Sequence, residues 1–283
     1  MAEAPPVVLT IAGFDPSSGA GVTADIKTMA AHGCYGVACI TALTVQSTAG
    51  VRRVHPVESE LVAETLAELV ADVKISAVHI GMLGNADVVK AVSDFLGSRS
   101  RKARLPNVVL DPIIKASSGA DLLDAAGVKL LKEKLIPLAD VVTPNLDEAA
   151  ALTGLRVTDL DGMKAAAAQL HELGCPAIVV TGGHLEKATD VLSFKTAQGI
   201  EYEVFKAERL RSNSTHGTGC AFATAMACHL ALGRGLAEAA LLAKTYVTAA
   251  ISYGHDLGRG VGPVHHLYRL GQQRRAASSG DES

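Results

Sequence analysis

The sequence predicts an α/β fold: a central, mostly parallel sheet with helices on both faces and an antiparallel hairpin at one edge. Hydrophobic residues make up 48% and charged residues 19% of the 283 positions, which is the composition of a globular protein. Short apolar segments without polar alternation recur along the chain, as expected for parallel strands buried on both faces. Amphipathic helical patterns separate these segments, and this alternation of strands and helices is typical of a parallel sheet.

The chain is expected to form a single domain over residues 1–270. No Pro/Ser-rich linker and no internal repeat interrupts the alternation of strands and helices. The length exceeds the usual ~100–200 residues per domain, but one large α/β domain can absorb it. Residues 271–283 are polar and poor in apolar side chains, so we expect them to form a disordered tail.

Apolar runs that end in Gly or Pro mark the expected strands. They lie at 7–13, 36–43, 77–83, 107–112, 140–145 and 177–183. Helical spacing of apolar residues predicts helices at 22–33, 58–73, 86–97, 124–135, 145–153, 158–173, 217–232 and 236–253. The segments 190–195 and 201–207 flank the residues TAQG, a pattern that predicts the antiparallel edge hairpin.

Charge and composition argue against nucleic acid and membrane partners. Lys and Arg number 26 against 29 Asp and Glu, so the net charge of −3 provides no general attraction to polyanions. Aromatic residues are 4% of the chain, which leaves little surface for stacking nucleic acid bases. Residues 28–51 carry no charged side chain and are long enough to span a bilayer. His32, Gly33 and the polar residues 46–48 instead predict a helix end, a buried strand and a polar loop.

The cysteines predict a reducing compartment. They are five in number, widely spaced and without any CxxC motif, which argues against a disulfide framework or a zinc ribbon. We therefore expect a cytoplasmic protein. The pair His265 and His266 has no third ligand at metal-binding spacing nearby, so we expect no metal there.

Ligands of an open parallel sheet bind beyond the carboxyl ends of its strands. The polar residues just after each expected strand are therefore the candidate site residues. These segments are 15–21, 44–48, 81–82, 111–112, 143–148 and 182–184, joined by 215–220 at the start of a long helix.

The segment STHGTGCAFATAMA (214–227) predicts an anion-binding helix terminus. Gly217 and Gly219 let backbone N–H groups converge before a helix whose N-terminus carries about half a positive charge. Cys220 stands at the head of this helix, where the dipole is expected to lower the thiol pKa toward thiolate. The alternative is that Cys220 is a small buried hydrophobic residue. No GK[ST] follows the glycines, which excludes a Walker P-loop.

The segment TPNLDEA (143–149) has two interpretations. Asn145 as helix N-cap and Glu148 three residues later form a capping box, which explains the spacing completely. At the ligand edge the same two side chains also suit Mg²⁺ bound through water, since Mg²⁺ keeps several waters. Asp111 places a further carboxylate at this edge, unless it is an ordinary solvated loop residue.

Two segments near the N-terminus are candidates for binding a small molecule. Residues 14–28 predict a tight turn of small residues that lets a ligand approach the backbone, with Asp15 and Asp25 on either side. Gln46 follows a buried strand, and its amide offers both a donor and an acceptor to the edge of a heterocycle. Alternatively, Gln46 is an ordinary polar loop residue.

Eight segments in order resemble the signature blocks of the hydroxymethylpyrimidine/phosphomethylpyrimidine kinase family of the ribokinase-like superfamily. They are IAGFDPSSGAGVTADIKT, ITALTVQST, IGMLG, VVLDP, TPNLDEA, TGGHL, THGTGCAFATA and GVGPVHHL, from residue 7 to residue 267. THGTGC is the most specific block, because the wider superfamily has Asp where this branch has Cys. The resemblance implies a ribokinase-like fold with ATP and Mg²⁺ as cofactors. It further implies phosphorylation of 4-amino-5-hydroxymethyl-2-methylpyrimidine to its monophosphate and then its diphosphate, in thiamin biosynthesis.

The resemblance also implies roles for individual residues. The residues expected to bind or line the pyrimidine pocket are Gly13, Asp25, Gln46 and Met82. The expected anion hole is formed by Gly217, Thr218, Gly219 and Cys220, with Cys220 as the candidate base. The residues expected at the cofactors are Asp111 and Lys244 for ATP, and Asn145 and Glu148 for Mg²⁺ through water.

Two positions depart from the family pattern. Thr181 stands where the family usually has Lys before GGH, and Ser214 replaces a usual Asn. Lys244, which matches a Lys of the family's last helix, is then the candidate replacement cation near the phosphates.

Three other functions compete with this interpretation. A pyridoxal kinase of the same superfamily is the nearest, because its substrate is also a hydroxymethyl heterocycle. A nucleotide-dependent oxidoreductase would need GxGxxG after the first strand, and SSGAG does not match it. A non-catalytic pyrimidine-binding protein would not need the complete anion-hole block. A homodimer is expected in each case.

Overall fold

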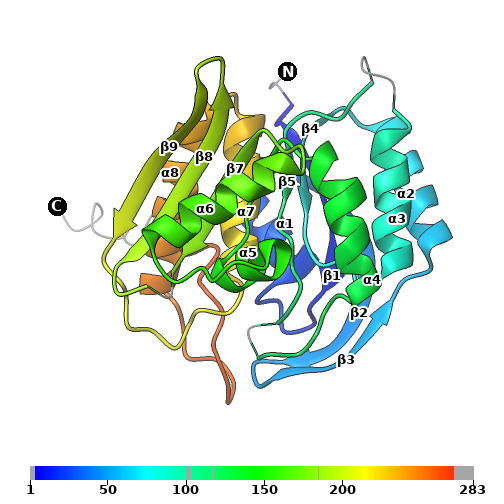
Figure 1. Ribbon diagram of the computed structural model, residues 1–283. Helices are drawn as coiled ribbons and strands as arrows, with labels where there is room; N and C mark the ends of the chain where they lie inside the picture. The colour runs from blue at the N-terminus through cyan, green and yellow to red at the C-terminus, as the bar shows by residue number, and fades with distance from the viewer. Residues whose placement is uncertain (1–3, 100–102, 117, 184, 271–283) are drawn as a thin grey trace.

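Six parallel strands form the centre of one sheet in the computed structural model, which describes residues 4–99, 103–116, 118–183 and 185–270. These strands are β1 (Val7–Phe14), β2 (Tyr35–Ser47), β4 (Ile75–Ile80), β5 (Val108–Leu110), β6 (Val141–Val142) and β7 (Ala177–Gly182). Each pairs in parallel with its neighbour in the order β2-β1-β4-β5-β6-β7, which confirms the predicted parallel sheet (Figure 1). The tail at 271–283 lies outside the described residues.

Antiparallel strands extend the sheet at both edges. β8 (Ala188–Thr196) pairs with β7, and β9 (Gly199–Ala207) pairs with β8, which confirms the predicted edge hairpin. At the opposite edge, β3 (Gly50–Pro56) pairs antiparallel with β2. The described part of the sheet therefore runs β3-β2-β1-β4-β5-β6-β7-β8-β9.

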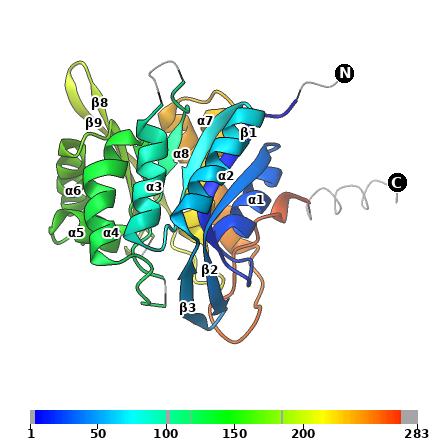
Figure 2. The ribbon, with the colours of Figure 1, turned by 90° about the vertical axis from the view of Figure 1, so that its right-hand side faces the viewer.

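Helices cover both faces of the sheet (Figures 1 and 2). One face carries α2 (Ser59–Asp72), α3 (Ala86–Gly97), α4 (Ala125–Leu130), α5 (Leu146–Thr153) and α6 (Leu160–Glu172). The other carries α1 (Gly21–Ala31), α7 (Thr218–Ala231) and α8 (Leu236–Ser252). Side chains of β1 alternate between the two faces of the sheet. Leu9 and Ile11 pack against the first group of helices, and Val8 packs against the second. The helix expected at 124–135 continues beyond α4 as a π-helical turn, η1 (Leu131–Leu135), and a 3-10 turn, η2 (Ile136–Leu138).

The polar loop expected at residues 46–48 is shorter than predicted, because only Thr48 of these residues lies in the turn. β2 continues to Ser47, and the chain turns at Gly50, whose φ of +129° favours glycine, into β3. β-Branched residues such as Val45 and Val54 occur on both strands and favour extended backbone. Figure 2 shows the resulting hairpin projecting beyond the helices. This extension places Gln46 on a strand, where its side chain has a defined direction.

The uncharged stretch 28–51 spans the end of α1, the strand β2 and the turn into β3. In the described part of the chain, no helix combines the length and the apolar character that a membrane span requires. All five cysteines are buried as free thiols.

Candidate active site

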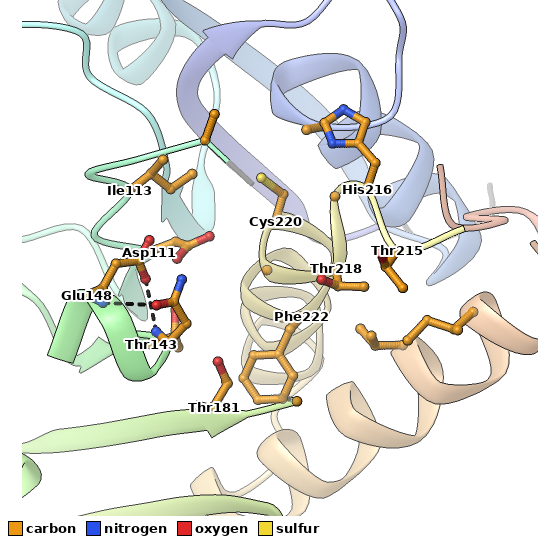
Figure 3. A pocket seen from close by; sticks show the side chains of 18 of the residues that line it. Asp111, Ile113, Thr143, Glu148, Thr181, Thr215, His216, Thr218, Cys220 and Phe222 are labelled. Carbon is orange, nitrogen blue, oxygen red and sulfur yellow. Dashed lines mark hydrogen bonds between the residues drawn. The ribbon is translucent and has the colours of Figure 1, made fainter. Parts of the chain in front are cut away.

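A cavity of about 930 Å³ opens at the carboxyl ends of the parallel strands. Its walls come from the ends of β1, β2 and β7, from the segments that follow β4, β5 and β6, and from the N-terminus of α7 (Figure 3). Eleven of the twelve predicted site residues line it. They are Gly13, Gln46, Met82, Asp111, Asn145, Glu148, Gly217, Thr218, Gly219, Cys220 and Lys244.

The N-terminus of α7 faces the cavity with the glycine-rich turn in front of it. Gly217 has a φ of +83°, and a Cβ at this position would lie 1.8 Å from the carbonyl oxygen of Gly19. Only glycine therefore permits the loop after β1 to approach the helix this closely. Gly219 is exposed in the cavity wall, where a Cβ would lie 3.5 Å from Asp111 Oδ2. The N–H groups of a first helical turn lack partners within the helix, so this end of α7 suits an anion.

Cys220 lies in the cavity wall but is only 7% exposed. Burial raises the pKa of its thiol well above the usual range, and the negative charges of Asp25 and Asp111 add to the rise. The backbone N–H of Gly21 faces the thiol and lowers its pKa, but by less. The expected thiolate at the helix head is therefore wrong for the ligand-free protein, because burial and the carboxylates outweigh the helix dipole.

Cys220 is consequently expected to react slowly with iodoacetamide near neutral pH. Alkylation requires the thiolate, and a raised pKa means that the thiolate forms only at higher pH. The rate of modification at Cys220, followed by mass spectrometry, should keep rising beyond the ordinary thiol pKa of about 8.5. A rate that levels off below about pH 8 would contradict the raised pKa.

The predicted capping box is present at the start of α5. Asn145 Oδ1 accepts a hydrogen bond from the Glu148 N–H at 2.9 Å, and Glu148 Oε2 accepts one from the Asn145 N–H at 2.9 Å. These bonds fix Glu148 at the floor of the cavity (Figure 3). The capping interpretation is thus confirmed, and it leaves the other carboxylate oxygen of Glu148 outside the box.

Two buried carboxyl groups make the site suitable for a cation. Burial raises the pKa of Glu148 to about 7. Asp111 is also buried, and burial together with the charge of Glu148 raises its pKa. A cation beside the two groups would relieve both effects, so these residues fit Mg²⁺. Among the described residues, no cluster of three or more His, Cys, Asp or Glu side chains could hold a metal ion. Water would complete the shell, as Mg²⁺ favours.

Asp25 is the predicted site residue that does not line the cavity. It is fully buried in α1, where its carboxylate accepts hydrogen bonds from Thr10 Oγ1 at 2.6 Å and Thr224 Oγ1 at 2.8 Å. His79 Nδ1 lies 3.3 Å from Asp25 Oδ2. The prediction that Asp25 lines the pyrimidine pocket is therefore wrong. Its carboxylate instead connects α1 with β1, β4 and α7 below Cys220.

Lys244 reaches the cavity from α8 as one half of a buried ion pair. Its Nζ lies 2.8 Å from Asp190 Oδ2, and Asp190 Oδ1 accepts a hydrogen bond from the Gly182 N–H at 3.0 Å. Asp190 is also the partner of Thr181 in the β7–β8 ladder. The cation of Lys244 thus lies beside the position where the family pattern has Lys, but Asp190 neutralises it in the ligand-free protein.

Several titratable residues of the cavity wall received no role in the sequence analysis, among them Asp15, Arg209, Arg211 and His216. Arg209 and Arg211 lie after β9, in a segment without hydrophobic periodicity that would have drawn attention to them. Asp15 follows β1 directly, and His216 stands within THGTGC, so their positions in the motifs were available as signals. His216 Nε2 lies 2.8 Å from Asp15 Oδ2 and 3.4 Å from Gln46 Nε2.

Comparison with known proteins places this geometry in a family. Residues 15–265 match the family model described as phosphomethylpyrimidine kinase. A hydroxymethylpyrimidine/phosphomethylpyrimidine kinase from Streptomyces coelicolor is 41% identical over 95% of this chain and 97% of its own length. The thiamine biosynthesis bifunctional protein ThiED from Geobacter sulfurreducens is 43% identical over 92% of the chain. The chain spans only 52% of that bifunctional relative.

Among solved structures, the ADP complex of Bacillus subtilis pyridoxal kinase is similar with a TM-score of 0.84 and 34% identity, covering 94% of this chain and 100% of that one. The sheet, the cavity at its carboxyl edge and this likeness define a kinase of the ribokinase-like fold. The chain belongs to the phosphomethylpyrimidine kinase family, which confirms the resemblance found in its sequence.

Proposed function

We propose that this protein is an ATP-dependent kinase that phosphorylates 4-amino-5-hydroxymethyl-2-methylpyrimidine to its monophosphate and then to its diphosphate. One observation carries the proposal: a single cavity holds the anion-binding end of α7, Cys220 and the amide of Gln46. The name of the Streptomyces coelicolor relative describes both phosphorylation steps. Phosphoryl transfer requires mainly positioning and charge stabilisation, and the cavity contains groups suited to both.

The phosphates are assigned to the part of the cavity between α7 and α5. The first-turn N–H groups of α7 that follow Thr218, at Gly219 and Cys220, would bind the transferring phosphoryl group. Asp111 and Glu148 would hold Mg²⁺, with Asn145 fixing Glu148 through the capping box. Bound Mg²⁺ would supply positive charge that offsets the negative charge of the phosphates.

The acceptor is assigned to the part of the cavity between β1 and β2. A Cβ at Gly13 would lie 2.9 Å from Met82 Sδ, so glycine leaves Met82 free to form the floor of this part. Gln46 would bind the ring edge, and Cys220 would orient the hydroxymethyl group toward the phosphate. Because the thiol is protonated in the ligand-free protein, the acceptor proton would move late, once bonding to phosphorus makes the hydroxyl more acidic, and it would pass to an oxygen of the transferred phosphoryl group.

A coupled assay of ADP formation tests this proposal with three acceptors: the hydroxymethylpyrimidine, its monophosphate and pyridoxal. Turnover of both pyrimidines, at a higher kcat/KM than pyridoxal, is the expected result. The likeness to a pyridoxal kinase supports pyridoxal phosphorylation as the second candidate function. Preferred turnover of pyridoxal would replace the first proposal by the second.

Gln46→Ala is expected to raise the KM for the pyrimidine and leave the KM for ATP unchanged. A binding site that loses a hydrogen-bonding partner loses about 1–3 kcal/mol, which corresponds to roughly 5- to 150-fold in affinity. Steady-state kinetics with each substrate varied in turn measures both constants. Gln198→Ala, in the exposed turn between β8 and β9, is the matched control. An unchanged KM for the pyrimidine would remove Gln46 from the acceptor site.

Glu148→Gln is expected to raise the Mg²⁺ concentration needed for half-maximal activity by about 10-fold, the cost of one charge-assisted contact. Gln keeps a carbonyl oxygen that can accept the Asn145 N–H, so the capping box and the folded structure should remain. Replacing a carboxyl group whose pKa is raised by burial should also leave thermal stability undiminished. Titration of activity with Mg²⁺ measures the effect on metal binding, and thermal unfolding in the absence of Mg²⁺ measures the effect on stability. An unchanged Mg²⁺ requirement would mean that the metal binds elsewhere.

We also propose a cytoplasmic homodimer. The five free thiols support a reducing compartment.

Exposed apolar side chains on β2, at Ile40, Leu43 and Val45, support a contact with another chain. Sedimentation equilibrium would measure the mass in solution, and a monomer at micromolar concentration would contradict the dimer.

A further inference from the structure

His216 is held so that its ring nitrogen reaches the acceptor part of the cavity. Its backbone N–H donates to the Gly262 carbonyl at 3.0 Å, and its own carbonyl accepts from the Val264 N–H at 3.2 Å. A Cβ at Gly19 would lie 2.3 Å from His216 Cδ2, so glycine makes room for the ring. The imidazole Nε2 then faces Asp15 Oδ2 at 2.8 Å and the Gln46 amide at 3.4 Å.

The hydrogen on His216 follows from its partner. Asp15 accepts hydrogen bonds from the Ser17 N–H, the Ser17 hydroxyl and the Ala20 N–H. Burial raises its pKa, but the bonds from His216 and Ser17 lower it by more. An ionised carboxylate only accepts. Nε2 therefore carries the hydrogen, which it donates to Asp15, and it has no lone pair with which to accept a hydrogen from the Gln46 amide.

Thr44 determines which atom of the Gln46 amide must be on the side away from His216. Its hydroxyl oxygen lies 3.0 Å from the Phe14 carbonyl oxygen and 3.2 Å from Gln46 Oε1. A hydroxyl has one hydrogen, and the Phe14 carbonyl can only accept, so that hydrogen belongs to the bond with Phe14. The Gln46 atom facing Thr44 is then required to donate.

The conditions set by His216 and Thr44 are both satisfied when the Gln46 amide is rotated by half a turn about its Cγ–Cδ bond. This rotation exchanges the positions of the amide oxygen and nitrogen. The amide nitrogen then donates to Thr44, and the amide oxygen faces the N–H of His216. Oxygen and nitrogen of such an amide are assigned from their hydrogen-bond partners. One N–H and one oxygen lone pair remain for a ligand.

We propose that His216 and Thr44 fix the Gln46 amide in this one orientation and thereby determine acceptor specificity. The remaining donor and acceptor match a ring nitrogen beside an exocyclic amino group, the pair that an aminopyrimidine presents and pyridoxine does not. The inference rests on the proposed function, because it concerns the acceptor of the same site. His216 and Thr44 are thus positioning residues that act through Gln46.

The test compares kcat/KM for the hydroxymethylpyrimidine with kcat/KM for pyridoxine. His216→Phe and Thr44→Val should each lower the ratio of the two about 10-fold, the equivalent of one well-oriented hydrogen bond. His55→Phe, an exposed residue of β3, is the matched control and should leave the ratio unchanged. Thermal unfolding identifies any variant that fails to fold. If His216→Phe does not fold, the result with Thr44→Val decides the outcome.

The double variants with Gln46→Ala separate positioning from a general structural effect. If His216 and Thr44 act through Gln46, adding either substitution to Gln46→Ala should change the ratio no further. Folded single variants with an unchanged ratio, or multiplicative losses in the double variants, would overturn the inference. If the wild-type protein does not turn over the pyrimidine, the proposed function fails. Calorimetric binding of the pyrimidine and of pyridoxine to the same variants then decides the inference.

Discussion

Gly219→Val is expected to lower kcat with both pyrimidine acceptors by about 10²–10³-fold, as much as the loss of an oxyanion-hole donor, because the phosphoryl group could no longer reach the N–H groups of α7. Gly219 is the second residue of α7 and lines the cavity where the transferring phosphoryl group is assigned. A Cβ there would lie 3.5 Å from Asp111 Oδ2, in ordinary contact, so the substitution fits the ligand-free protein. The branched side chain would occupy the space that the phosphate needs.

Folding should survive this substitution. Gly219 is exposed, and replacing glycine in a helix by valine changes helix propensity by less than about 1 kcal/mol. Gly235→Val places the same side chain at the N-terminus of α8, outside the cavity wall, and serves as the control. Steady-state kinetics and thermal unfolding of both variants form the measurement. A folded Gly219→Val protein with full activity would mean that the phosphate binds away from α7.

The location of the site could be predicted because it follows from topology. Parallel strands bring their carboxyl ends to one edge, so residues such as Gln46, Asp111 and Cys220, far apart in sequence, were expected together. The capping box was predictable for a local reason, since Asn145 and Glu148 contact each other across one helical turn. Each of these inferences needs only the sequence spacing and the sheet.

Interactions across the fold could not be predicted in the same way. The partners of Asp25 come from β1, β4 and α7, and no spacing in the sequence relates Asp25 to Thr10, His79 or Thr224. Asp25 follows a glycine-rich loop in sequence, but its position in α1 buries its side chain outside the cavity wall. The pairing of Lys244 with Asp190 has the same origin, because an α8 residue meets β8 only after the chain folds.

The pKa of Cys220 shows how burial reverses a local expectation. A helix N-terminus stabilises a thiolate, and the Gly21 N–H adds to that effect. The carboxylates of Asp111 and Glu148, buried a short distance away, act in the opposite direction. The same carboxylates are the groups assigned to Mg²⁺, so metal binding would remove part of the charge that keeps Cys220 protonated. The thiol and these two carboxyl groups are thereby coupled electrostatically.

Cys220→Ala is expected to lower kcat by about 10²-fold with little change in either KM, because the acceptor hydroxyl loses the side chain that orients it toward the phosphate. Alanine removes the sulfur but keeps the helix, because Cys220 lies in the first turn of α7 and Ala has the highest helix propensity. Cys220→Asp should recover part of the activity, since the wider superfamily resembled by this sequence has Asp at this position. Cys228→Ala, a buried cysteine at the other end of the same helix, is the matched control and should reduce stability more than turnover. The measurement is kcat for the three variants, each at saturating ATP and pyrimidine, together with thermal unfolding. If Cys220→Ala turns over at the wild-type rate, Cys220 is a small buried hydrophobic residue and has no part in the chemistry.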